Sequence, residues 1–342
     1  MRTKQITLND IALKLNVSTV TVSKALRGHP DISPETTELV KKLAEEMGYS
    51  PNFMARNLSS RKSNMIGLVV PKIAHHFFSS LVEQIYDLAL ENNYEVILAV
   101  SQENSEKEMK YIHTLLSMRV DGIIVSISQQ TTNFEIFETV RNREIPLVFV
   151  DRFPEMSNVN TVTVDDRGGA YKAVQHAASI GYKKIALFAG NTKINIGRDR
   201  LEGFKHGMAD NKLKINPDWI LKGEFGEKSG YESFMKLYKA RKLPDLIIAV
   251  TYPIAMGIYA AAKEARLKIP KDIDIICFGN SQEQKFLSPP LSCINQPTDE
   301  LANQSVKVLM ENIDNREGFV PKHVVVDTNL ILRGTCTKYN RA

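Results

Sequence analysis

The amino-acid sequence predicts a small all-α domain followed by two α/β lobes, each built on a doubly wound parallel sheet. Three observations support this fold class. The chain has 342 residues, more than the roughly 100 to 200 residues of one typical domain. Its first fifty residues show helical periodicity only. From Met65 onward, apolar runs alternate with helical stretches, which is typical of parallel sheets covered by helices on both faces.

The first fifty residues carry the start and stop signals of three short helices. Thr7 can cap the segment LNDIALKL and Ser18 can cap TVTVSKAL, because a hydroxyl oxygen can accept a hydrogen bond from an unpaired N–H of the first turn. Gly28 suits the left-handed residue that follows a helix. Pro34 opens the third helix and Gly48 ends it. Two short helices joined by a tight turn match the helix-turn-helix pattern.

Helical spacing also predicts which side chains these helices bury. The expected buried positions are Leu8, Ile11, Ala12 and Leu15 in the first helix and Val22, Ala25 and Leu26 in the second. By the same spacing Val22 is a better core candidate than Val20.

Positive charge is concentrated in the first part of the chain. Residues 1–62 contain ten Lys and Arg against six Asp and Glu, whereas the other 280 residues contain 34 against 33. A basic terminal region indicates a nucleic acid or another anionic surface as partner, although a merely solvated face has the same composition.

The second part of the chain contains two similar series of apolar runs. The first is MIGLVVP, YEVILAV, VDGIIVSI and IPLVFVD, and the second is KKIALFAG, WILKGEF, DLIIAVT and DIDIICFGN. The remaining segments are LSCINQP, a helix from Leu301 to about Asn315, and KHVVVDTNLIL. They are too short for a third lobe, so we expect them to cross back and complete both. Such lobes leave a cleft at the carboxyl ends of their strands, which hinge motion can open and close.

Export, membrane insertion and disulfide formation are not supported by the sequence. No run of about 18 or more apolar residues and no apolar signal-peptide core occurs, so we expect a cytoplasmic protein without a membrane partner. Cys277, Cys293 and Cys336 are odd in number and scattered, which favours reduced residues in or near the core.

Six segments occur in the order and spacing of a known family: TLNDIALKLNVSTVTVSKALRG, GYSPNFMARNL, IGLVVP, VDGIIV, RLEGF and PPLSCINQP. Over the whole chain they resemble the lac repressor and galactose repressor (LacI/GalR) family of bacterial transcriptional regulators. The resemblance implies a helix-turn-helix DNA-binding domain at 1–50, a hinge helix or linker at 51–62, and an effector-binding and dimerisation domain at 63–342. This last domain would have the plan of periplasmic binding proteins. Its N-lobe would comprise about 63–163 and 295–323, and its C-lobe about 164–294 and 324–339.

The resemblance assigns DNA contacts to the second helix and its surroundings. Base-reading positions match Thr19, Val20 and Lys24, and the hydroxyls suited to phosphates belong to Thr7, Ser18, Thr21 and Ser23. Lys24 departs from the arginine common in the family, so a bidentate contact with guanine becomes a single ammonium donor.

The hinge segment carries the family's minor-groove positions, which are Asn52, Ala55, Arg56 and Leu58. Leu58 matches the family's apolar wedge between base steps. A helix at 52–59 would have only about two turns, fewer than the roughly 12 to 15 residues that an isolated helix needs. It therefore needs a partner to hold it, and an ordinary linker is the alternative.

The resemblance also places an effector in the cleft. The family's effector positions carry over to Phe77, Phe78, Asp151, Arg200, Phe225, Thr251 and Gln296. Arg200 and Asp151 can clamp hydroxyl or carboxylate groups, and the aromatic rings can cover a ring face. The alternatives are core packing for Phe77 and Phe78 and a structural ion pair for Arg200.

Two departures bear on the effector. Tyr252, in VTY, and Gly279, in CFGN, stand where many family members have aspartate. The loss of two acidic acceptors argues against a plain sugar bound as in typical members. A sugar, a sugar phosphate or another metabolite stays open, and so does a protein co-effector.

Other functional classes find less support. The chain contains no GxGxxG after a strand, no GxxxxGK[ST], no HExxH and no GxSxG motif. His75 and His76 are adjacent and cannot share a helix face, so we expect no metal site, no cofactor and no enzyme. A periplasmic solute-binding protein would need an export signal. We therefore expect a homodimeric, sequence-specific DNA-binding regulator on the nucleoid, a repressor rather than an activator, that binds a near-palindromic operator and is controlled by the cleft ligand.

Overall fold

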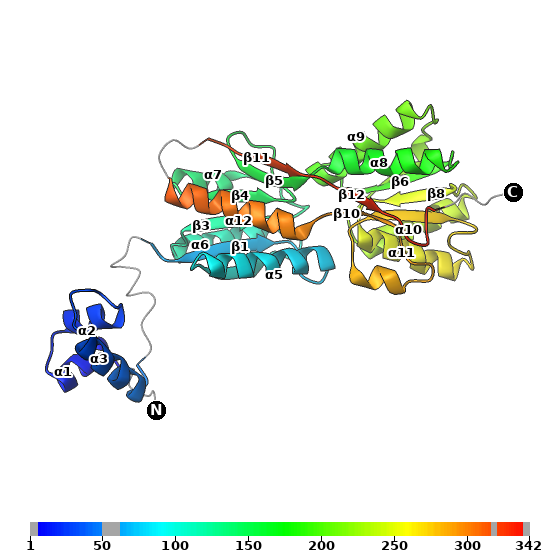
Figure 1. Cartoon of the computed structure of the whole chain (residues 1–342). Coiled ribbons are helices and arrows are strands. Elements are labelled where there is room, and N and C mark those ends of the chain that lie inside the picture. Colours follow the sequence, from blue (N-terminus) through cyan, green and yellow to red (C-terminus); the bar gives the residue numbers. More distant parts are fainter. Residues whose placement is uncertain (1–5, 50–61, 316–319, 338–342) are drawn as a thin grey trace. The chain divides into compact units, whose positions relative to one another are not determined.

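The computed structural model describes residues 6–49, 62–315 and 320–337. The chain divides into two compact units, residues 1–63 and residues 64–342 (Figure 1). The expected hinge helix at 52–59, with Asn52, Ala55, Arg56 and Leu58, lies outside the described residues.

The first unit contains the three expected helices, α1 (Leu8–Leu15), α2 (Thr19–Leu26) and α3 (Pro34–Glu46). The caps form as predicted. Thr7 Oγ1 accepts from the backbone N–H of Asp10, whose carboxylate accepts from the N–H of Thr7. Ser18 Oγ accepts from the N–H of Thr21. Gly28 and Gly48 have φ values of 65° and 66°, a left-handed conformation that costs glycine little.

The core of this unit agrees with most of the helical pattern. Its buried side chains are Ile11, Ala12, Val22, Ala25, Val40 and Ala44. Val22 is fully buried and Val20 is 61% exposed, which confirms the choice between them. Leu8, Leu15 and Leu26 are only partly buried at the edge of the core, because an eight-residue helix has too few turns to enclose a second apolar row.

The second unit begins with a six-stranded parallel sheet in the order β11-β5-β4-β3-β1-β2. Its strands are β1 (Met65–Val70), β2 (Glu95–Val100), β3 (Gly122–Val125), β4 (Leu147–Val150), β5 (Asn160–Val164) and β11 (His323–Val326). Its helices are α5 (His76–Glu91), α6 (Ser105–Ser117), α7 (Glu135–Asn142) and α12 (Thr298–Asp314). We call this sheet with its helices the first lobe.

Helices cover both faces of this sheet. Alternate strand residues point to opposite faces. Leu68 packs in the cluster formed with α5 and α12, and its neighbour Val69 packs in the cluster formed with α6 and α7. Both are fully buried. The sheet is therefore doubly wound, as the continuous apolar runs predicted.

The second sheet has the order β12-β10-β9-β8-β6-β7. Its strands are β6 (Ile185–Gly190), β7 (Ile220–Lys222), β8 (Leu246–Ala249), β9 (Asp274–Phe278), β10 (Cys293–Asn295) and β12 (Asn329–Ile331). Its helices are α8 (Asp166–Ser179), α9 (Asn195–Asp210), α10 (Glu227–Lys239) and α11 (Tyr252–Glu264), and two 3-10 turns lie at Pro217–Trp219 and Gln282–Phe286. We call this group the second lobe. Only β12 runs antiparallel to its neighbour.

The chain crosses between the lobes three times: after β5, after β10, and between β11 and β12. Figure 1 shows β11 and β12, in red, in different lobes, so KHVVVDTNLIL does complete both sheets. The last crossing lies at 327–328 rather than near 323, because residues 323–326 pair in parallel with β5. β5 itself, NTVTV, is not among the expected strands because its alternating polar residues do not form an apolar run.

Two further expectations concern bulk properties. Cys277, Cys293 and Cys336 are free and buried, as core residues. Among the described helices, none combines the length and apolarity of a membrane span.

Candidate DNA-binding helix and effector cleft

The N-terminal half of α2 presents polar and apolar groups to solvent. Ser18, Thr19 and Val20 are exposed, and Thr21 is half-buried. The hydroxyls of Ser18 and Thr21 are 2.8 Å apart and hydrogen-bonded. A hydroxyl has one donor and two acceptor sites, so both retain capacity for a phosphate oxygen. Thr19 and Val20 project from the rigid first turn without any role in the core.

Lys24 has a partner that the sequence pattern did not indicate. Its Nζ donates to Asp31 Oδ2 at 2.8 Å, and His29 Nδ1 lies 3.3 Å from the same oxygen. The hydrogen bond from Lys24 holds the pKa of Asp31 below its ordinary value. Both side chains are solvent-accessible, and exposed ion pairs are weak. Lys24 can therefore exchange Asp31 for a base or a phosphate.

A cavity of about 440 Å³ lies between the two lobes. All seven predicted effector residues line it: Phe77, Phe78, Asp151, Arg200, Phe225, Thr251 and Gln296. Phe77 and Phe78 begin α5, Phe225 follows β7, and Gln296 follows β10. The carboxyl ends of parallel strands thus bring together residues far apart in sequence, as expected of a doubly wound sheet. Their contact with a ligand stays a prediction.

Phe77 and Phe78 differ in burial. Phe78 is buried in the first-lobe core and Phe77 only packs against it, with the rings edge to face at 5.1 Å. Both also line the cavity. Phe78 therefore both packs in the core of the first lobe and lines the cleft.

Arg152 is a buried residue of the cleft that the sequence pattern missed. It is 4% exposed. Its Nη1 donates to both carboxylate oxygens of Glu103, at 2.9 and 3.1 Å. Its guanidinium carbon lies 5.5 Å from the ring centroid of Phe78 and 5.0 Å from that of Phe225. Arg152 thus occupies the space between an aromatic ring of each lobe, where cation–π attraction holds it.

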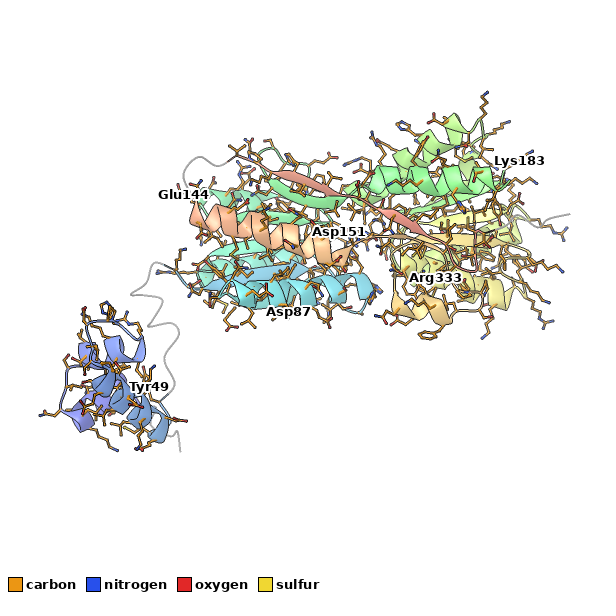
Figure 2. The ribbon with its side chains drawn as sticks, viewed as in Figure 1. Tyr49, Asp87, Glu144, Asp151, Lys183 and Arg333 are labelled. Carbon is orange, nitrogen blue, oxygen red and sulfur yellow. The ribbon has the colours of Figure 1, made fainter. Side chains whose placement is uncertain are left out.

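Asp151 precedes this arginine in a left-handed turn, with φ 63°, which sets the direction of both side chains. Figure 2 labels it at the junction of the lobes. Burial raises the pKa of the Asp151 carboxyl, and the nearby Arg152 and Arg200 oppose that rise. Its backbone oxygen accepts from Asn195 Nδ2 of α9 at 2.9 Å. Asp151 therefore takes part in the contact between lobes.

Arg200 is held by its own lobe. It is 1% exposed, its Nε donates to Asp166 Oδ1 at 2.7 Å, and its guanidinium carbon lies 4.0 Å from the Phe278 ring centroid. Its Nη1 also donates to the backbone oxygen of Val250. Burial raises the pKa of Asp166, against the effect of Arg200. Two nitrogens of Arg200 thus donate to groups of its own lobe, which supports the alternative of a structural ion pair. Because Arg200 also lines the cavity, the clamp of Arg200 and Asp151 around a ligand stays a prediction.

Four polar atoms of residues that line the cavity have no hydrogen-bond partner among the described residues: Gln129 Oε1, Arg152 Nε, Arg200 Nη2 and Ser281 Oγ. Two of them, Gln129 Oε1 and Arg152 Nε, belong to the first lobe. Both residues are fixed by the same carboxylate, because Glu103 accepts from the backbone N–H of Gln129 at 2.8 Å as well as from Arg152. A buried unpaired polar atom is costly. A ligand hydroxyl can donate to Gln129 and accept from Arg152, which would satisfy both.

The two positions that depart from the family pattern also line the cavity. Tyr252 begins α11, and Gly279 follows β9 with φ 95°, a conformation that side chains rarely adopt. The rim carries charges of both signs, including Lys72, Lys285 and Glu224. The cavity therefore offers a ligand both polar groups and charges of either sign.

Comparisons with known proteins agree with both units. The model of bacterial regulatory proteins of the lacI family matches residues 7–52, and that of a periplasmic binding protein-like domain matches residues 174–336. The HTH-type transcriptional repressor PurR of Haemophilus influenzae (strain PittEE) is 30% identical over 332 residues, covering 96% of this chain and 97% of that protein. The chain belongs to the lacI family of bacterial regulatory proteins.

Other members of the lacI family match along nearly the same length. Catabolite control protein A of Priestia megaterium is 30% identical over 305 residues, 89% of this chain and 91% of that one. The crystal structure of the lac repressor dimer bound to operator and the anti-inducer ONPF has a TM-score of 0.86 and 25% identity, covering 97% of this chain and 99% of that chain. The expected fold class and family are thus confirmed.

Proposed function

We propose that this chain is a transcriptional repressor that binds an operator as a homodimer and is controlled by a ligand in the cleft. The observation that carries this function is the combination, in one lacI-family chain, of an exposed recognition helix and a polar cavity between two lobes. Relatives at 30% identity are named repressors, and the lac repressor is solved as a dimer on its operator.

The DNA-binding step would use α2 in the major groove, with its N-terminal side chains at the base edges. Thr19, Val20 and Lys24 would face the bases, and Val20 can contact a thymine methyl group. Ser18 and Thr21 would bind phosphates and set the register. Thr7 and Ser23 are assigned to the same role. Each protomer would bind one half of a near-palindromic site.

The hinge assignment rests on family resemblance alone. Asn52, Ala55, Arg56 and Leu58 would form a short helix against the minor groove, with Leu58 between base steps. Low intrinsic stability suits such a segment to a switch, since small displacements of the lobes can decide whether it forms.

The effector would be a hydroxyl-bearing metabolite, a sugar, sugar phosphate or similar compound, whose groups pair with Gln129 and Arg152. A protein co-effector is the second candidate. It is supported by Tyr252 and Gly279, which stand where many family members have aspartate. The ligand changes operator affinity only by its differential affinity for the two conformations, and the coupling is reciprocal. We assign no catalytic step to the cleft, and place the repressor on the nucleoid in the cytoplasm.

The decisive experiment selects bound duplexes from random DNA with the full chain, and repeats the selection with a panel of cell metabolites. We expect one near-palindromic sequence to emerge and at least one metabolite to shift its affinity. Affinity should also fall steeply with salt, as counterion release requires. A chain that prefers no duplex over bulk competitor, with or without metabolites, would contradict the proposal.

A matched pair of variants tests the recognition helix. Lys24→Ala should weaken operator binding by about 10- to 100-fold and relax the preference at one base pair, since base contacts are worth about 1–3 kcal/mol. Asp31→Asn removes the partner of Lys24 and should leave the base preference unchanged. A uniform loss over all sequences in Lys24→Ala would make Lys24 a phosphate contact only.

A further inference from the structure

The second lobe carries a dense group of basic side chains at one end. Within the described residues, twelve exposed Lys and Arg lie just before its strands or at the ends of the preceding helices. They are Lys183, Lys184, Lys212, Lys214, Lys236, Lys239, Arg241, Lys242, Lys263, Arg266, Lys268 and Lys271. We call this surface the basic end.

The topology of the sheet gathers these residues. β6, β7, β8 and β9 are all parallel, so the segments that precede them lie at the same edge of the sheet. This edge is opposite the one that forms the cleft. Figure 2 shows Lys183 there, at the far side of the second lobe from Asp151.

The exposed acidic side chains of these segments are already engaged. Asp218 pairs with Lys242 at 2.8 Å, Glu264 accepts from the Tyr231 hydroxyl at 2.6 Å, and Asp210 accepts from Tyr171 at 3.1 Å. The cations therefore outnumber the neighbouring exposed carboxylates several-fold, and the basic end has a net positive field.

Helix dipoles do not account for this charge. Four helices, α8 to α11, end at the basic end, and cations near helix C-termini are favourable. Four helices of the first lobe, α5, α6, α7 and α12, end in the same way at the starts of its strands. The exposed cations of the corresponding described segments there are Arg119, Arg143 and Lys322, with Glu91, Glu95, Glu144, Glu311 and Asp314 beside them. The two lobes thus have the same number of helix C-termini at these ends but very different numbers of exposed cations. This difference indicates a further role for the basic end.

We propose that the basic end binds a second stretch of double-stranded DNA through its phosphates, without sequence preference. Lysine supplies ten of the twelve cations in this described surface. Lysine is depleted in protein–protein interfaces, which instead use aromatic and apolar anchors. Of the large hydrophobic side chains that are exposed in the described residues, only Tyr238 belongs to these segments. Dispersed ammonium groups suit a continuous polyanion.

The basic end lies far from the point where the chain enters the second unit. The chain enters the second unit at Asn64, next to the start of β1, and Glu144 marks the same strand-start end of the first lobe. Figure 2 shows Glu144 and Lys183 at opposite ends of this unit. One protein would thereby hold two duplexes. This interaction does not depend on what the cleft binds.

The test uses the full chain and a bridging assay. A bead-bound duplex of generic sequence, about 40 base pairs long, captures the protein, and capture of a second, fluorescent duplex is measured against salt concentration. The test variant combines Lys183→Gln, Lys214→Gln, Lys268→Gln and Lys271→Gln, all in loops, where the loss of an exposed charge leaves folding intact. The control combines Lys110→Gln, Arg119→Gln, Arg143→Gln and Lys307→Gln, four exposed cations of the first lobe.

We expect the wild type and the control to bridge duplexes and the test variant to lose at least tenfold in capture at low salt. The logarithmic salt dependence of capture should also weaken by about 0.9 for each phosphate that the variant no longer neutralises. Equal capture by test and control variants would overturn the proposal. Failure of the wild type to bridge would also overturn it and leave an acidic protein as the partner to examine. Unchanged operator affinity in the test variant separates this outcome from failure of the repressor function.

Discussion

Each lobe buries an arginine at the cleft, and the two side chains have different surroundings. Arg200 pairs with Asp166, and both belong to the second lobe. Arg152 pairs with Glu103, and both belong to the first lobe. Arg200 also donates to a backbone oxygen of its own lobe, and each arginine keeps one side-chain nitrogen without a hydrogen-bond partner among the described residues.

The aromatic contacts show the same difference. Arg200 stacks on Phe278 within one lobe. Arg152 lies against Phe78 of the first lobe and Phe225 of the second. An arginine whose partners share one lobe stabilises that lobe, and one whose partners come from both lobes stabilises their closure. Two similar buried cations therefore differ in what they hold together, one lobe for Arg200 and the two lobes for Arg152.

Breaking the pair in the second lobe should have the largest effect. Arg200→Ala leaves Asp166 buried without its partner, so the free energy of unfolding should fall by about 3–5 kcal/mol. Urea denaturation measures it. Arg198→Ala, at a solvent-accessible pair with Glu155, is the control and should cost little. If both variants lose the same small amount, Arg200 is not structural.

Removing the charge in the first lobe should act on the ligand instead. Arg152→Ala should weaken the effect of the metabolite found in the selection by about 10- to 100-fold, since a hydrogen bond to a charged group contributes about 1.5–3 kcal/mol. Arg152→Lys keeps the charge and should retain part of the response. Titration of operator affinity with the metabolite measures both. An unchanged titration in Arg152→Ala would remove Arg152 from the ligand site.

The last effect appears only as a change of stability with pH, and it concerns a buried carboxyl of the first lobe that forms no direct ion pair within the described residues. Glu108 accepts from the N–H of Ser128 at 2.6 Å and the hydroxyl of Thr131 at 2.7 Å, and burial raises its pKa to about 7. The folded protein thus binds this proton more tightly than the unfolded chain. The stability it contributes is fully present below the unfolded pKa of 4.5 and is lost as the pH rises through about 7.

Glu108→Gln should therefore flatten the pH dependence of the unfolding free energy by about 2–3 kcal/mol over this range, since one pKa unit corresponds to about 1.4 kcal/mol. Chemical denaturation at several pH values between 4.5 and 7 measures it. Glu106→Gln, on the exposed side of α6, is the control. The same slope in both variants would exclude Glu108 as the titrating group.

Local signals in the sequence predicted the local structure. The caps at Thr7 and Ser18 depend on residues three apart, and the strands of the first series depend on continuous apolar runs, so both were visible without a fold. β5 was missed because Asn160, Thr161 and Thr163 are buried polar residues within a strand. Their burial follows from neighbouring strands far away in sequence.

The sequence predicted several residues that line the cleft but not which side chains pair with each other there. Family resemblance supplied seven of the residues that line the cavity, but Arg200 meets Asp166 and Arg152 meets Glu103 across 34 and 49 positions. Such pairs depend on strand order and on the turn at Asp151. Arg152 could have been suspected as a charged residue directly after a strand end, where parallel sheets place ligands.

The threefold crossing between the lobes has a consequence for synthesis. The first sheet is incomplete without β11 and the second without β12, and β12 ends at Ile331. The ribosome must therefore synthesise the chain as far as β11 before the first sheet is complete and as far as β12 before the second is, whereas the three N-terminal helices can fold much earlier. In a nascent chain the N-terminal helical unit would therefore be folded while the two lobes are still incomplete. A stop codon before β11 would release the helical unit without the lobes that regulate it.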